Sequence, residues 1–394
     1  MLQSKKQYYW LVVFLGVVSA IAPLSTDMYL PALPNMQAEL GVSVSFLQLT
    51  ISLSIAGMAI GQLFAGPISD IAGRKYPLVI GISIFTLCSF LCAVVENIYL
   101  FLLLRFVQGL AGASGIVISK AIARDVANGQ ELTKLIAVLS IIHGLAPVLA
   151  PVIGGQVLLF SDWRGVFLAL TLIGVVMVAM CLYNQETLPK TKRLRAQIDS
   201  FTSLTSLLKD RYFRGHVMMQ SVITIGFFSY IGTSSFLFQE LYGVTPQEFS
   251  YIFGLIAVGL MFTGATVGLA VKHFKEYHIL PFAATVAVIG SGLLFCTLTF
   301  ELPLICAILT ILLSVMQLSV VFTCSFSLAM REQGDKAGSA AALLGALPML
   351  TGGVCMPLSG MLSANPAIPM SALLFLGWLV GLIIYLKYIY PHHR

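Results

Sequence analysis

Long apolar runs alternate with short polar segments along almost the whole chain. Twelve runs of about twenty residues can be drawn, at 9–31, 45–65, 77–95, 98–121, 134–158, 164–184, 214–237, 248–271, 279–299, 303–330, 338–361 and 369–387. A helix of about 20 apolar residues is long enough to cross the hydrocarbon core of a bilayer. The runs lack the alternating pattern of barrel strands, and backbone groups in lipid must be paired internally. The pattern therefore predicts an all-α membrane protein with twelve transmembrane helices.

One polar connector is much longer than the others and divides the runs six and six. We expect an N-terminal six-helix half over residues 1–185, a cytoplasmic linker over 186–213 and a C-terminal six-helix half over 214–394. Secondary transporters commonly have two such halves, with a substrate site near the midplane of the membrane. The alternative is that the connector is an accidental insertion.

Composition and charge support a membrane location and set the orientation. The chain is 58% hydrophobic and 10% charged, whereas a soluble domain has about 25% charged residues. The net charge is +6, and 20 of the 22 lysines and arginines fall on one side of the predicted membrane, the exceptions being Arg105 and Arg164. The positive-inside rule places that side and both termini in the cytoplasm. The charge is therefore a topological signal, and we expect no binding to nucleic acid.

Two opposite charges lie inside the predicted spans. Asp27 is near the outer end of the first span, and Arg105 is in the outer third of the fourth. At about 1.5 Å per residue the two reach compatible depths. Since a charge in hydrocarbon costs at least about 2.5 kcal/mol, we predict that Asp27 and Arg105 are partners. We interpret Asp27 as a proton-binding carboxylate that alternates between protonated and ionised forms; the alternative is a static structural ion pair.

Polar and aromatic residues near these charges are candidates for substrate contact. Arg105 and Gln108 share one face of a helix with two glycines, and because arginine keeps its proton, this face must meet water or a carboxylate. Aromatic walls suit apolar ligands, although any one aromatic residue also suits helix packing or lipid. The predicted substrate-binding residues are Tyr29, Gln108, Phe227 and Tyr230.

The turn after the second span combines glycine, an acid and two basic residues. These residues are Gly66, Asp70, Gly73, Arg74 and Lys75. A tight turn needs glycine, and the acid can pair with a basic residue across the bundle or lie at a helix N-terminus. Such contacts can hold one conformation closed at the cytoplasmic side. The simpler alternative is a basic turn that only sets the topology.

The fifth span is unusually rich in proline and glycine. The residues concerned are Gly144, Pro147, Pro151, Gly154 and Gly155. Prolines bend a helix and glycines permit close packing. Both residue types are common in membrane helices, so this pattern gains meaning only in combination with the others.

Together these motifs resemble the signatures of the major facilitator superfamily. The turn is similar to its G-x-x-x-D-x-x-G-R-K loop, Arg105 to Gly109 to its R-x-x-Q-G pattern, and the fifth span to its antiporter signature, with Ala150 where glycine is usual. The equivalent loop of the second half, Gly268 to His278, keeps only Gly268 and scattered basic residues. Over the whole chain the sequence resembles the Bcr/CflA group of drug:proton antiporters.

The resemblance implies a major facilitator fold in a bacterial inner membrane, and a monomer as the working unit. It also implies export of bicyclomycin-type or chloramphenicol-type drugs in exchange for protons by alternating access. A proton-coupled transporter of a small metabolite is the alternative. We expect no enzyme activity, cofactor or metal, because the six histidines form no metal or nucleophile–base spacing, and no Walker loop binds ATP. The expected partners are a small molecule, protons and the lipid bilayer.

Overall fold

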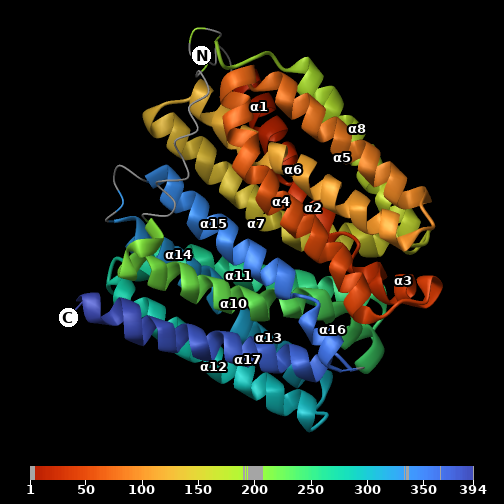
Figure 1. Cartoon of the computed structure of the whole chain (residues 1–394), viewed down its shortest axis with the longest axis vertical. Helices are drawn as coiled ribbons and strands as arrows, with labels where there is room; N and C mark the ends of the chain where they lie inside the picture. Colours follow the sequence, from red (N-terminus) through yellow and green to blue (C-terminus); the bar gives the residue numbers. More distant parts are fainter. Residues whose placement is uncertain are drawn as a thin grey trace. The chain divides into compact units, whose positions relative to one another are not determined.

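The computed structural model describes residues 5–189, 191, 193, 207–331, 333, 337–363 and 365–393. Nearly all of this part of the chain is helical (Figure 1). Eleven of its helices are long and apolar enough to cross a membrane, and a bent pair at the N-terminal end brings the number of spans up to 12. The prediction of an all-α membrane protein is therefore confirmed.

The first compact unit contains residues up to 40 and residues 53–197. Its helices are α1 (Lys5–Ser19), α2 (Ile21–Asp27), α3 (Leu33–Leu40), α4 (Val44–Ala72, from residue 53), α5 (Lys75–Val94), α6 (Ile98–Val126), α7 (Gly129–Val157) and α8 (Trp163–Tyr183). Helix α5 packs against α6 and α8, while α1 and α2 pack against α6 and α7. This arrangement brings the first, fourth and fifth spans together.

The first span is bent rather than straight. The segments Tyr8–Ser19 and Pro23–Leu40 meet at an angle of 42°. The break lies just before Pro23, which has no amide hydrogen with which to continue the helix. A short 3₁₀ helix, Leu30–Ala32, then interrupts the segment again beyond Asp27. Asp27 therefore lies between two helix breaks, and the helical segment extends past the predicted end at residue 31.

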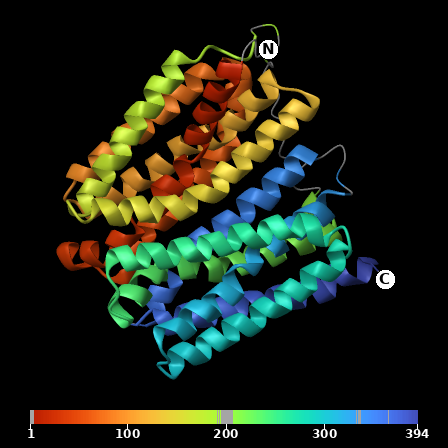
Figure 2. The ribbon, with the colours of Figure 1, turned by 180° about the vertical axis from the view of Figure 1, so that it is seen from behind.

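The second compact unit contains residues 41–52 and 198–394. Its helices are α10 (Arg211–Phe236), α11 (Pro246–Ala270), α12 (Glu276–Thr299), α13 (Leu304–Val315), α14 (Gln317–Met330), α15 (Ala337–Cys355), α16 (Leu358–Leu362) and α17 (Ala367–Ile384). Helix α10 lies beside α15 and α17, and α17 lies beside α12 (Figure 2). The predicted tenth span is divided at Met316, and the eleventh is divided before α16, at Pro357.

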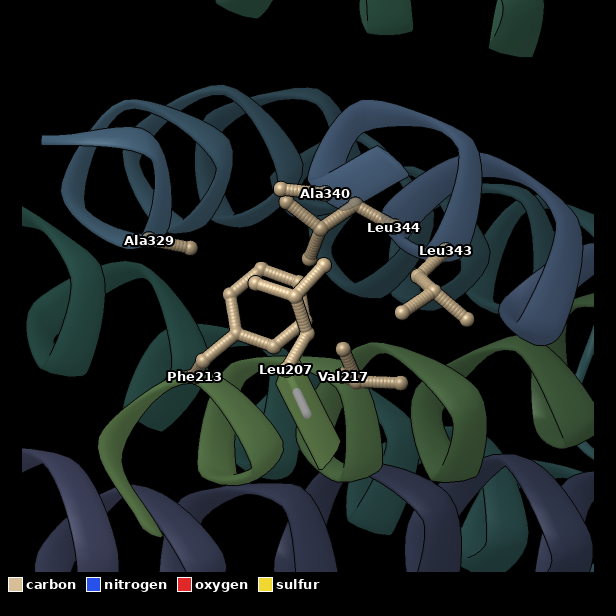
Figure 3. Packing of buried hydrophobic residues seen from close by; sticks show 7 residues of the cluster. All are labelled: Leu207, Phe213, Val217, Ala329, Ala340, Leu343 and Leu344. Atoms are coloured by element: carbon tan, nitrogen blue, oxygen red, sulfur yellow. The ribbon is translucent and has the colours of Figure 1, made fainter. Parts of the chain in front are cut away.

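Buried contacts hold this second unit together. Figure 3 shows one cluster in which Leu207 and side chains from the start of α10 meet side chains of α14 and α15; its members are Leu207, Phe213, Val217, Ala329, Ala340, Leu343 and Leu344. In the same unit, the Gln48 amide donates to the Thr233 hydroxyl at 3.0 Å and to the Ser359 hydroxyl at 3.1 Å. Most of the predicted linker, 186–213, lies outside the described residues, so the predicted division of the chain at this connector stays a prediction.

Candidate functional site

Asp27 is the last residue of α2 and is only 8% exposed. The neighbouring Thr26 hydroxyl donates to its Oδ1 atom at 3.0 Å. Helix α2 ends at Asp27, and the 3₁₀ helix Leu30–Ala32 begins three residues later. The carboxylate is thus placed in a protein interior at the end of a short helix.

Arg105 lies in α6 and is completely buried. Its Nη2 atom donates to the main-chain carbonyl of Ser25 at 2.9 Å, and Nη1 donates to the Gln108 side-chain oxygen. Gln108 in turn donates to the Ser89 hydroxyl of α5 at 2.7 Å. A hydrogen-bonded chain therefore runs from α2 through α6 to α5, and it places the predicted residue Gln108 beside Arg105.

Aromatic rings complete the surroundings of the guanidinium. The Arg105 Cζ atom lies 4.6 Å from the centroid of the Tyr29 ring and 5.6 Å from that of Phe167. The two rings are 5.4 Å apart, and both are fully buried. Cation–π contacts of this kind are worth about 2 kcal/mol or more when desolvated. Tyr29 thus packs on Arg105; its predicted role in substrate binding stays a prediction.

The sequence predicts that Asp27 and Arg105 are partners, and in the structure Arg105 bonds the main chain beside Asp27 rather than its carboxylate. Among the ion pairs of the described residues, none joins the Asp27 carboxylate to the Arg105 guanidinium. Arg105 instead reaches the carbonyl of Ser25, two residues before Asp27. This carbonyl is in the last turn of α2, where main-chain oxygens lack a helical donor and carry partial negative charge. Arg105 therefore has an acceptor that is unaffected by protonation of Asp27.

Helix α7 approaches this site through the predicted fifth-span motif. Gly154 faces the main-chain carbonyl of Met28 so closely that a Cβ atom would overlap the oxygen. Pro147 and Pro151 lie inside the helix, and Gly155 is buried beside Gly154. The absence of a side chain at Gly154 is what allows α7 to touch the residue that follows Asp27.

A cavity of about 270 Å³ lies between α1, α6 and α7 in the same unit. Its polar lining residues are Ser19, Ser119, Lys120 and His143, and Gly144 of the fifth-span motif also lines it. These side chains offer hydroxyl, ammonium and imidazole groups to a small molecule. Sequence reasoning missed this cavity, because it ended the fourth span at residue 121 and counted Lys120 only among the basic residues of the cytoplasmic side, whereas α6 continues to Val126.

The predicted loop motif forms a network of charges. Arg74 pairs with Asp70 at 2.5 Å and with Asp125 at 2.8 Å. Gly73 adopts a φ angle of 96°, which favours glycine, and a Cβ atom there would overlap the Glu186 carboxylate. Lys75 donates through its ammonium group to a carbonyl near the end of α8. The pair of Asp70 with Arg74 was expected, whereas the contacts to Asp125 and Glu186 were not.

Glu186 ties the end of the sixth span to this turn. Its carboxylate accepts the main-chain N–H of Arg74 at 2.8 Å and that of Lys75 at 3.2 Å. Burial works to raise the pKa of Glu186, but these N–H donors, that of Leu188 and the nearby Arg193 guanidinium outweigh burial and hold the pKa below its ordinary value. Gly66, in contrast, faces Val117 with ordinary space for a Cβ atom, at 3.6 Å.

The predicted aromatic residues of the second half lie together in the second unit. Tyr230 stacks on Phe253 with ring centroids 6.1 Å apart, and Phe227 lies 6.5 Å from Tyr230. The Tyr230 hydroxyl is buried and has no hydrogen-bond partner in the described part of the chain. Phe227 is half-buried. These rings form an apolar group with one unsatisfied polar atom.

Comparison with known proteins places these features in a family. The model described as Major Facilitator Superfamily matches residues 15–347. The chain is 38% identical to the "Uncharacterized MFS-type transporter YdgK" of Bacillus subtilis, over 94% of this chain and 93% of that protein. It is 27% identical to the "Bicyclomycin resistance protein homolog" of Haemophilus influenzae, with the same coverage of 94% and 93%.

Two further similarities agree with this. The "Multidrug resistance protein MdtL" of Escherichia coli O9:H4 is 30% identical, over 82% of this chain and 81% of that protein. Among solved structures, a D-xylose-proton symporter superposes with a TM-score of 0.79 and 15% identity, covering 97% of this chain and 98% of that one. At that identity the structural match concerns the fold alone.

Proposed function

The chain belongs to the major facilitator superfamily, and on this premise we propose that it exports small apolar or amphiphilic drugs in exchange for protons. Two relatives with names that refer to bicyclomycin and multidrug resistance support the drug assignment. The bacterial relatives and the basic residues on one predicted side support a place in the bacterial cytoplasmic membrane, with both termini in the cytoplasm.

The observation that carries the proposal is the bonding of Arg105. Its guanidinium is satisfied by the Ser25 carbonyl and by Gln108, not by the Asp27 carboxylate. Protonation of Asp27 therefore leaves no buried arginine without an acceptor, a loss that would cost several kcal/mol. In this mechanism Asp27 takes a proton when it faces outward and releases it when it faces inward, while Arg105 keeps α2 and α6 joined in both states.

The drug competes with the proton for the Asp27 region. The contact between Gly154 and the Met28 carbonyl couples α7 to the residue next to Asp27. Helix α7 also forms one wall of the cavity, through His143 and Gly144, so occupancy of the cavity and protonation of Asp27 both act on α7. Two ligands that act on one two-state element are coupled without direct contact.

Reconstituted vesicles with an internal pH dye test this proposal. A proton gradient is imposed, bicyclomycin or chloramphenicol is added, and the wild type is compared with Asp27→Asn. The matched control is Glu131→Gln, which neutralises an acid in the first turn of α7. Drug-dependent proton flux in the wild type and in the control, but not in Asp27→Asn, is expected. Equal flux in all three proteins refutes the role of Asp27.

A second candidate function is proton-coupled transport of a small polar metabolite. The observation that favours it is the polar lining of the cavity, where Ser19, Ser119, Lys120 and His143 gather. Accumulation of a polar solute in vesicles under a proton gradient, with no flux in response to any apolar drug, would select this function.

A further inference from the structure

A second and larger cavity lies in the C-terminal unit, between α11, α12 and α14. Its volume is about 570 Å³, against about 270 Å³ for the cavity beside α7. Its walls are mostly apolar, and the exceptions are Thr263, Thr266, Gln317 and His278. Thr263 already donates to carbonyls of its own helix and of Met316, so the lining presents few free polar groups. A cavity of this kind fits a hydrocarbon chain.

The cavity results from the way in which α11 and α12 are supported. Both helices pack on α13 and α14, and in two views they lie apart along most of their length (Figures 1 and 2). Small residues, Ala270 and Ala283, line the space near the loop that joins the two helices. Two lining residues, Phe274 and Phe282, are 65% and 71% exposed. The cavity wall is therefore continuous with the outer apolar surface of this unit. In membrane-spanning helices, this surface faces lipid.

The loop beside the cavity carries positive charge. Lys272, His273 and Lys275 lie between α11 and α12, and all three are exposed. Neither lysine takes part in an ion pair of the described residues. The acid next to them, Glu276, is bound by Arg331 at 2.7 Å and does not neutralise the loop. The mouth of an apolar cavity thus has a cationic border.

We propose that this cavity binds an anionic phospholipid of the cytoplasmic leaflet. One acyl chain enters the cavity along Phe282, and the phosphate lies at Lys272, Lys275 and His278. Basic sites between helices at the cytoplasmic side suit anionic lipid headgroups, whereas a chain-shaped apolar space without a charged border would not select among lipids. The proposal rests on the orientation proposed above and is independent of which compound is transported.

The test uses the purified full-length protein and native mass spectrometry with phosphatidylglycerol or phosphatidylcholine. The variant is Lys272→Gln/Lys275→Gln, and the matched control is Lys134→Gln/Lys209→Gln, which removes two exposed lysines elsewhere. We expect phosphatidylglycerol to bind the wild type and the control alike. Each lost lysine should weaken binding about fivefold, and the pair about 30-fold. Equal retention of phosphatidylglycerol by the variant, or equal binding of both lipids by the wild type, overturns the proposal.

A second variant tests the cavity itself. Ala270→Leu places a branched side chain in the space without altering the lysines, so it should reduce phosphatidylglycerol binding and the rise in melting temperature that this lipid causes. Unchanged binding would show that the acyl chain lies elsewhere and would overturn the proposal. Displacement of the lipid by bicyclomycin or chloramphenicol would make the cavity a drug site and would also overturn it. Loss of drug-driven proton flux at Asp27→Asn has no bearing on these outcomes, so the two proposals fail separately.

Discussion

Gly154 offers the sharpest test of how the fifth span is joined to Asp27. In Gly154→Ala the new methyl group would overlap the Met28 carbonyl, which is main chain and cannot rotate away. Extra volume in a well-packed region typically costs about 1–3 kcal/mol. The change also brings a gain, because alanine favours a helix over glycine by up to about 1 kcal/mol.

Gly268→Ala is the matched control, because a Cβ atom at this glycine of α11 has no neighbour within 4 Å. The gain in helix propensity applies to both variants, so the difference between them isolates the overlap. We expect Gly154→Ala to be less stable than Gly268→Ala by about 1–3 kcal/mol. Thermal unfolding of the two purified proteins in one detergent measures this difference.

Function should suffer more than stability at this position. If α7 and the Met28 segment move apart to remove the overlap, Asp27 moves as well, and displacements of about 1 Å commonly cost about 100-fold where geometry is critical. We therefore expect drug-driven proton flux of Gly154→Ala to fall at least tenfold, with Gly268→Ala close to wild type. Equal melting temperatures and equal flux for the two variants would refute the reasoning, since the contact would then carry neither packing nor coupling.

Three further predictions concern single side chains. Arg105→Lys keeps the charge, but an ammonium group cannot donate to the Ser25 carbonyl and to Gln108 from one planar group. The free energy of unfolding should therefore fall by about 1.5–3 kcal/mol, as measured in a thermal melt. No fall would contradict the hydrogen bonds described for Arg105. Tyr230→Phe removes a buried hydroxyl that has no partner in the described structure, so the variant should melt no lower than wild type, and a loss of about 1 kcal/mol would mean that the hydroxyl is bonded. The lowered pKa of Glu186 stabilises the fold fully at pH values above the ordinary pKa of a glutamate, and this stabilisation is lost as pH falls through the lower pKa of the folded state. In Glu186→Gln, the melting temperature should therefore fall less steeply as the solution is acidified. An unchanged acid slope would exclude a contribution from this carboxylate.

The spans were predictable from sequence because lipid imposes one rule on every backbone group. Runs of about 20 apolar residues give the helices almost directly. The interruptions are harder to predict. Pro357 marks the end of α15 in the sequence, but the division between α13 and α14 at Met316 has no proline or glycine to announce it. Breaks of that kind depend on packing against neighbouring helices, which a single sequence does not contain.

The sequence allowed us to predict which residues form the candidate site, but not which hydrogen bonds they make. Depth along the helices was enough to place Arg105 near Asp27, because the rise per residue is fixed. The acceptor that Arg105 uses is the Ser25 carbonyl, and every residue carries such a carbonyl, so no residue type announces it. The same holds for Glu186, which binds the main-chain N–H groups of Arg74 and Lys75. The identity of a residue does not reveal whether its main-chain groups will be used as hydrogen-bond partners.

Those main-chain contacts have a consequence for how such a protein diverges. Ser25 and Met28 contribute their carbonyls to Arg105 and to the approach of α7, and these oxygens persist whatever side chain is present. Substitutions at these two positions can therefore accumulate without loss of the acceptors, while Arg105 and Gly154 tolerate little change. Related proteins can then differ in the side chains that line their cavities while they keep the contacts of Arg105 and Gly154 with these two carbonyls. Under the proposed function, the transported compound should therefore vary with the side chains that line the cavities, and proton exchange should vary least.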